Sequence, residues 1–203
     1  MARRVARIAV TAAVALGAVL AQGVGRSAEP SPADAQRGAA LMREQMALMT
    51  PELVERARSL SPEIQKFLMH VALRHERRSD TLTLAQVMQE ILADYQTIGA
   101  AIAMDNGPMA ADAARRVALH RLPRGGMLPY LPLDKVTNEG LGVLPAMEVA
   151  VEGSATKLAE AADKGDMVGA AHYYGAMTSG CVACHAHFRG QPGASAYVPR
   201  LRR

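Results

Sequence analysis

Two cysteines and a histidine near the C-terminal end have the types and spacing of a haem attachment motif. Cys181 and Cys184 are three residues apart, and His185 follows the second cysteine directly. In this Cys-x-x-Cys-His pattern each thiol bonds to one vinyl group of a c-type haem, and the histidine binds the iron. The chain has 2 cysteines, so the motif uses both. The pattern predicts one covalent haem c held by Cys181 and Cys184, with His185 as the proximal iron ligand.

The same residue types also occur in two other kinds of site. A disulfide beside a surface histidine is one, and a zinc site is another, although structural zinc usually needs four ligands. His187 lies about 200° around a helix from His185, so the two cannot bind the same iron. We expect His187 and His172 to be solvated. The sequence identifies no partners for the other histidines, which we expect at the surface or the core edge: His70, His75 and His120.

The N-terminus has the pattern of a secretory signal peptide over residues 1–28. Arg3, Arg4 and Arg7 precede an apolar stretch from Ile8 to Leu20, which is short for a membrane span. An uncleaved N-terminal anchor is the alternative. We expect export to the periplasm, where a lone cysteine pair is usually oxidised or bound to a cofactor.

Composition favours helices and argues against nucleic acid as a partner. Hydrophobic types make up 50% of the 203 residues and aromatic types 3%, whereas strands favour aromatic residues. The formal net charge of +4 falls to +1 without residues 1–25, which hold three arginines and no acid. Because no basic stripe with interleaved aromatic residues is present, we expect no nucleic-acid binding.

Three hydroxyl–proline pairs predict helix starts in an N-terminal helical extension over residues 29–80. A hydroxyl at the N-cap accepts a hydrogen bond from a free N–H group, and proline suits the first helical position. Residues 191–203 form a basic tail that we expect to be frayed. The extension's predicted helices cover roughly residues 33–49, 51–58 and 62–77.

Apolar residues at spacings of three and four predict four longer helices within residues 81–190. Short connections make successive helices antiparallel, so the prediction is an all-α protein with an antiparallel four-helix bundle. A segment rich in proline and glycine, residues 122–138, crosses between the second helix and the third, predicted at 139–163. Gly180 removes a side chain where the haem ring approaches. The last helix carries an inward stripe of Met167, Ala170, Tyr174, Met177, Cys181, Cys184 and Phe188.

The C-terminal position of the motif, continued as His185-Ala186-His187-Phe188-Arg189, resembles the cytochrome c′ family of class II cytochromes c. The resemblance covers roughly residues 82–190. It implies a periplasmic four-helix bundle with the haem between helices and Arg189 near the proximal histidine. That family carries Arg-x-x-x-Met on its first bundle helix, facing the distal side of the haem. Here Leu84-Ala85-Gln86-Val87-Met88 keeps the methionine and lacks the arginine. In an alternative alignment the first bundle helix is the one predicted at residues 33–49, and Met42 or Met46 is then the distal residue.

The distal side of the iron decides between two functions. Met88 as a distal ligand predicts a six-coordinate electron carrier that serves redox partner proteins. An open apolar distal side predicts a five-coordinate protein that binds NO or CO. We do not expect an enzyme, because no Ser-His-Asp, paired-carboxylate or phosphate-loop arrangement occurs. For the N-terminal extension, one hypothesis is that it docks a redox partner or a second copy of the chain, which would give a homodimer. The candidate haem-pocket residues are Met88, Tyr174, Met177 and Arg189.

Overall fold

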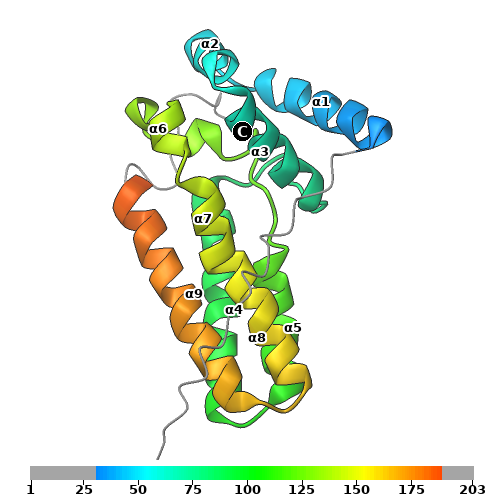
Figure 1. Cartoon of the computed structure of the whole chain (residues 1–203), viewed down its shortest axis with the longest axis vertical. Coiled ribbons are helices and arrows are strands. Elements are labelled where there is room, and N and C mark those ends of the chain that lie inside the picture. Colours follow the sequence, from blue (N-terminus) through cyan, green and yellow to red (C-terminus); the bar gives the residue numbers. More distant parts are fainter. Residues whose placement is uncertain (1–30, 189–203) are drawn as a thin grey trace, which may run out of the picture. The chain divides into compact units, whose positions relative to one another are not determined.

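A computed structural model describes residues 31–188 of the chain (Figure 1). This part is mostly helical, and its β structure is limited to an isolated bridge between Arg78 and Leu122. The all-α prediction is therefore confirmed. No helix within residues 31–188 is both long and apolar enough to cross a membrane. The predicted signal peptide, Arg189 and the predicted basic tail lie outside the described residues.

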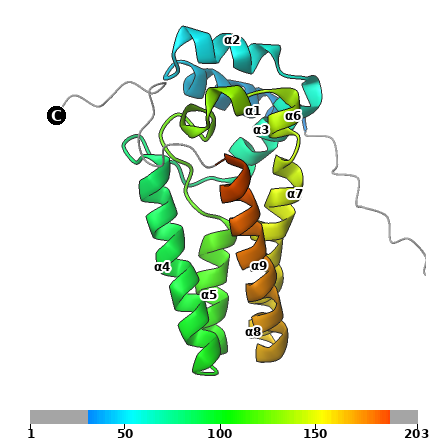
Figure 2. The ribbon, with the colours of Figure 1, turned by 90° about the vertical axis from the view of Figure 1, so that its left-hand side faces the viewer.

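The helices fall into an N-terminal group and a second group that contains the two longest helices (Figures 1 and 2). A segment of two short 3₁₀ turns, η1 (Leu128–Tyr130) and η2 (Leu133–Lys135), joins α5 to α6. A π-helical turn, η3 (Val149–Gly153), connects α7 to α8 without a break. The helices are α1 (Pro32–Met46), α2 (Pro51–Ser59), α3 (Pro62–Arg74), α4 (Leu84–Ala103), α5 (Gly107–Ala118), α6 (Asn138–Leu141), α7 (Leu144–Glu148), α8 (Ser154–Asp163) and α9 (Met167–Phe188).

Side-chain caps explain where several helices begin. The hydroxyls of Ser31, Thr50 and Ser61 each accept a hydrogen bond from the backbone N–H three residues later, at the starts of α1, α2 and α3. These three predicted starts are confirmed. At the start of α4, Thr83 and Gln86 form a reciprocal capping box.

The long helices α4, α5, α8 and α9 pack around a core of small side chains. α5 packs against α4 and α8, and α9 packs against α8. α4 and α9 meet over a shorter stretch, where the Tyr95 ring stacks on Tyr174 at 4.6 Å and its hydroxyl lies 2.9 Å from Thr178 Oγ1. We call this set of buried residues the long-helix core; it includes Ile98, Ala110, Ala114, Val117, Leu158, Ala162 and Met177.

A second apolar core joins the N-terminal helices to the segment between α5 and α7. The end of α9 belongs to it through Phe188. The N-terminal helices therefore pack directly onto the end of the long helices where α9 ends. We call this set the N-terminal core; it includes Leu53, Ile64, Leu68, Leu128, Leu141, Leu144 and Phe188.

Three predicted helix boundaries are wrong. The first helix, predicted at 33–49, ends at Met46. The helix predicted over 139–163 is interrupted, since α6 ends at Leu141 and α7 begins at Leu144. Pro145 explains the break, because its ring clashes with the carbonyl four residues earlier and it donates no hydrogen bond. α3 ends at Arg74 instead of residue 77, because the buried His75 leaves helical geometry with φ −91° and ψ 92°.

Candidate functional site

The cysteine pair lies one helical turn apart near the C-terminal end of α9. Both thiols are free and half-buried. Cys181 packs against the long-helix core and Cys184 against the N-terminal core. Burial raises the pKa of both thiols. The two sulfur atoms are therefore turned toward apolar surroundings, and no disulfide joins them.

His185 is exposed and lies on the side of α9 that faces α4. The hydrogen bond between Tyr95 of α4 and Thr178 of α9 identifies that side. His185 follows Thr178 by seven residues, almost two full turns, so helical geometry returns it to the same side. The imidazole thus lies between solvent and the neighbouring helix, beside two inward-facing thiols.

Met88 lies on the side of α4 that faces α9. It precedes Tyr95 by seven residues, and α4 begins at the end of the long helices where α9 finishes (Figure 2). Seven residues in either helix correspond to a rise of about 10 Å. Met88 is therefore at the level of His185 on the opposite helix. Its side chain is half-buried and belongs to neither apolar core of the described residues.

Two other predicted pocket residues pack between helices. Met177 is fully buried in the long-helix core. The Tyr174 hydroxyl reaches α4 at Gly99, where a Cβ would lie 2.8 Å from that oxygen. Gly99 is one turn beyond Tyr95, away from the cysteines, and burial raises the pKa of the Tyr174 phenol. The fourth predicted pocket residue, Arg189, is outside the described residues.

Gly180 serves a helix contact, which corrects its predicted role beside a haem ring. It is buried, and a Cβ at this position would lie 2.9 Å from Val151 Cγ2 and 3.0 Å from the backbone carbon of Ala150. Both neighbours belong to η3. The glycine therefore allows α9 to approach the π-helical turn closely.

His187 is not solvated, contrary to the prediction. It is half-buried, its Nε2 lies 3.0 Å from the carbonyl oxygen of Gly140, and its ring packs edge-on against Phe188. The reason is that α6 covers this side of α9. His172 is exposed, in agreement with the prediction.

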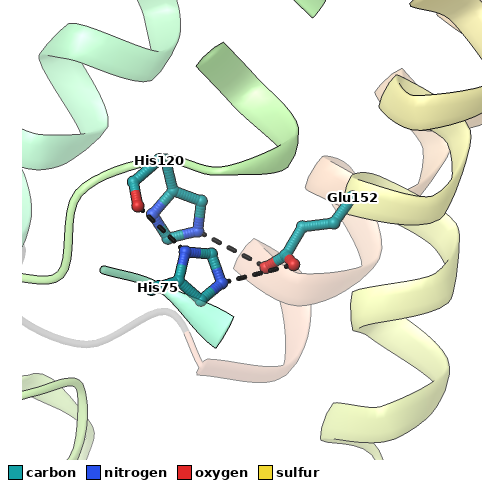
Figure 3. Close-up of side chains that lie close together, drawn as sticks. All are labelled: His75, His120 and Glu152. Atoms are coloured by element: carbon teal, nitrogen blue, oxygen red, sulfur yellow. Dashed lines mark hydrogen bonds and ion pairs between the residues drawn. The ribbon is translucent and has the colours of Figure 1, made fainter. Parts of the chain in front are cut away.

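Three residues that the sequence does not connect meet in a second cluster (Figure 3). His75 follows α3, His120 lies just beyond α5, and Glu152 lies in η3. Their ligand atoms all lie within 4.8 Å of one another. His75 is 1% exposed and Glu152 8% exposed, so the expected surface or core-edge position is wrong for His75. No sequence motif indicates this cluster. In the structure, Glu152 lies in a π-helical turn, and such turns are frequent at functional sites.

The charges of this cluster are coupled. Glu152 Oε2 lies 3.4 Å from His75 Nε2 and 3.2 Å from a guanidinium nitrogen of Arg74, which also pairs with Glu148. Burial alone raises the pKa of Glu152, but the nearby His120 and His75 rings outweigh it and lower the pKa to about 2. Burial likewise lowers the pKa of His75, yet Glu152 and the His120 carbonyl raise it above its ordinary value.

Comparison with protein-family models, curated proteins and solved structures finds no match for the chain. The resemblance to the cytochrome c′ family therefore rests on the motif residues and their order along the chain.

Proposed function

We propose that this chain is a periplasmic c-type cytochrome that carries one covalent haem and transfers single electrons. The supporting observation is the Cys-x-x-Cys-His motif, with two free thiols on the inner side of α9. In the proposal, Cys181 and Cys184 hold the haem and His185 binds its iron. When bound, the haem supplies one-electron redox chemistry.

The fold of the proposal is an antiparallel four-helix bundle like that of the cytochrome c′ family. Its members are α4, α5, the continuous α7–α8 helix and α9, within residues 81–190. The short connections from α4 to α5 and from α8 to α9 support an antiparallel order. The motif then lies on the last helix, as it does in that family.

The residues around the motif suit a partly shielded apolar ring. On α4, Leu84, Met88 and Ile91 share the side that faces α9, and all three are half-buried and uncharged. They would exclude water from the side of the ring opposite His185. On the outer side, Val182 is 64% exposed, so the attachment site is near the surface. Electron transfer to a partner protein requires a haem near the surface. The interfaces between redox partners typically bury only a small area.

Met88 distinguishes electron transfer from gas binding within this proposal. Its level and side match a distal ligand to an iron bound by His185. A thioether ligand favours ferrous iron and raises the reduction potential. The alternative function is binding of NO or CO at five-coordinate iron, and the observation that favours it is the apolar character of positions 84, 88 and 91, which suits a small uncharged ligand.

Optical spectra of the ferrous protein with and without CO test this assignment. We expect a low-spin six-coordinate spectrum that CO changes little, and a high-spin spectrum with ready CO uptake in Met88→Ala. The matched control is Met104→Ala, because Met104 is 62% exposed at the other end of α4. Ready CO uptake by the unaltered protein would exclude Met88 ligation and favour the gas-binding alternative.

A further inference from the structure

We propose that His75, His120 and Glu152 form a binding site for a divalent transition-metal ion, with Zn²⁺ the best match. The site is separate from the haem motif and does not depend on the proposed function. It joins three segments: the end of α3, the chain after α5, and η3 (Figure 3). Two histidines and one glutamate, with water as the fourth ligand, are a known ligand set for zinc.

Backbone hydrogen bonds hold both rings in the tautomer that a metal requires. His75 Nδ1 lies 2.9 Å from the carbonyl oxygen of His120, and His120 Nδ1 lies 2.9 Å from that of Arg121. A carbonyl oxygen only accepts, so each Nδ1 carries the hydrogen. In a neutral ring the lone pair is then on Nε2. A metal-binding histidine usually uses one ring nitrogen for the metal and donates the N–H of the other ring nitrogen to a carbonyl or carboxylate.

Both Nε2 atoms face the carboxylate of Glu152. His75 Nε2 and Glu152 Oε2 are buried side-chain atoms without an aligned hydrogen bond among the described residues. A lone pair opposite an acceptor-only carboxylate is unfavourable, so a cation between the three groups would be stabilising. One divalent cation bound by both Nε2 lone pairs and the carboxylate would supply that charge.

The distances between donor atoms fit a tetrahedral ion. Glu152 Oε2 lies 3.4 Å from His75 Nε2, and Glu152 Oε1 lies 3.5 Å from His120 Nε2. One ligand atom from each of the three residues can be chosen so that all lie within 4.8 Å of one another. Zinc bonds of about 2.0–2.1 Å to nitrogen and oxygen in tetrahedral geometry place neighbouring donors about 3.4 Å apart. A modest movement of the side chains would therefore bring all three to zinc-binding distance.

Neighbouring residues orient the carboxylate and leave an approach from solvent. Arg74 lies 3.2 Å from Glu152 Oε2 and also pairs with Glu148, so it restrains the position of the Glu152 carboxylate. Outer partners of this kind fix the orientation of a metal ligand. The side chain of His120 is 19% exposed, which provides access for the ion and for a water ligand.

Zinc binding to the full chain as purified tests the proposal. After removal of metal with a chelator, dialysis against ZnCl₂ and elemental analysis should give one zinc ion per chain. His75→Ala and Glu152→Gln should each weaken binding at least about 100-fold, because loss of an outer partner alone costs 10–100-fold. The control is His70→Ala, since His70 lies 3.4 Å from Glu148 but outside the cluster.

A second measurement uses no variant. X-ray absorption of the zinc-loaded protein should show nitrogen and oxygen ligands at about 2.0–2.1 Å, two of them imidazoles. Absence of stoichiometric zinc from the unaltered chain would overturn the proposal. So would zinc retention by both His75→Ala and Glu152→Gln, or an absorption spectrum with sulfur ligands, which would place zinc at the cysteines.

Discussion

The haem motif of α9 and the cluster of His75, His120 and Glu152 hold chemically active side chains by different means. The motif is five consecutive residues of one helix, so the helical repeat alone sets the spacing of its thiols and imidazole. The cluster comes from three separate segments, and it exists only when those segments pack together. The spacing of the motif's residues therefore does not depend on packing between helices, whereas the cluster's chemistry and the stability of the fold depend on each other.

The two regions also differ in how far they are exposed to solvent. His185 is exposed and both cysteines are half-buried, whereas His75 is 1% exposed. A half-exposed site exchanges electrons or ligands with the outside. A buried charged site strongly affects folding when one partner is lost.

The largest expected effect is on the cofactor. In the double variant Cys181→Ser/Cys184→Ser, no haem should stay attached after denaturation, because no thiol is left to form a thioether. Haem-stained denaturing gels measure this directly. Zinc binding at the cluster should be unchanged in the same variant, since neither cysteine is one of its ligands. Loss of zinc together with haem would show that the two regions are not independent.

Glu152→Gln should cause the largest loss of stability. With metal removed, the free energy of unfolding should fall by about 3 kcal/mol, because one partner of a buried ionic group is lost. Urea denaturation followed by circular dichroism measures it. Glu160→Gln, at an exposed position on α8, is the control and should change stability by less than about 0.5 kcal/mol. Equal effects of the two variants would contradict a buried ionic cluster.

The stability contributed by this cluster should depend on pH. Because folding lowers the pKa of Glu152 from 4.5 to about 2, its contribution is present above pH 4.5 and is lost as pH falls. Folding raises the pKa of His75 above 6.5, so that contribution is present below pH 6.5 and is lost as pH rises. The stability difference between the unaltered chain and Glu152→Gln should peak between these limits. A difference that stays constant from acid to alkaline pH would exclude the linkage.

A smaller effect tests the contact between α9 and η3, which lies between the two regions. Gly180→Ala should cost about 1–3 kcal/mol, because the new methyl group overlaps Val151 and the backbone of Ala150. Gly175→Ala, five residues earlier with nothing within 4 Å of its Cβ, should stabilise the helix by about 0.5–1 kcal/mol. Thermal melting of both variants measures the contrast. Stabilisation by Gly180→Ala would contradict the close approach.

The sequence predicts those features that depend only on residues close to one another along the chain. Ser31, Thr50 and Ser61 cap the helices that follow them, because a cap needs only a hydroxyl and the next turn. The inward stripe of α9 is confirmed by the burial of Ala170, Met177 and Phe188. Periodicity was sufficient in this case because one helix buries one side.

Features that depend on distant residues could not be predicted in the same way. His75 and His120 have no sequence relation to Glu152, and the π-helical turn that carries Glu152 has no composition signal. Burial of His187 depends on the Gly140 carbonyl in α6. The break before α7 was predictable, since Pro145 stands within the expected helix.

Covalent attachment of one haem to this chain is tested most directly by the intact mass of the exported protein under denaturing conditions, together with its pyridine haemochrome spectrum. We predict one haem per chain that survives denaturation, with no free thiol at Cys181 or Cys184. A haem-free chain with those two cysteines joined in a disulfide would contradict it.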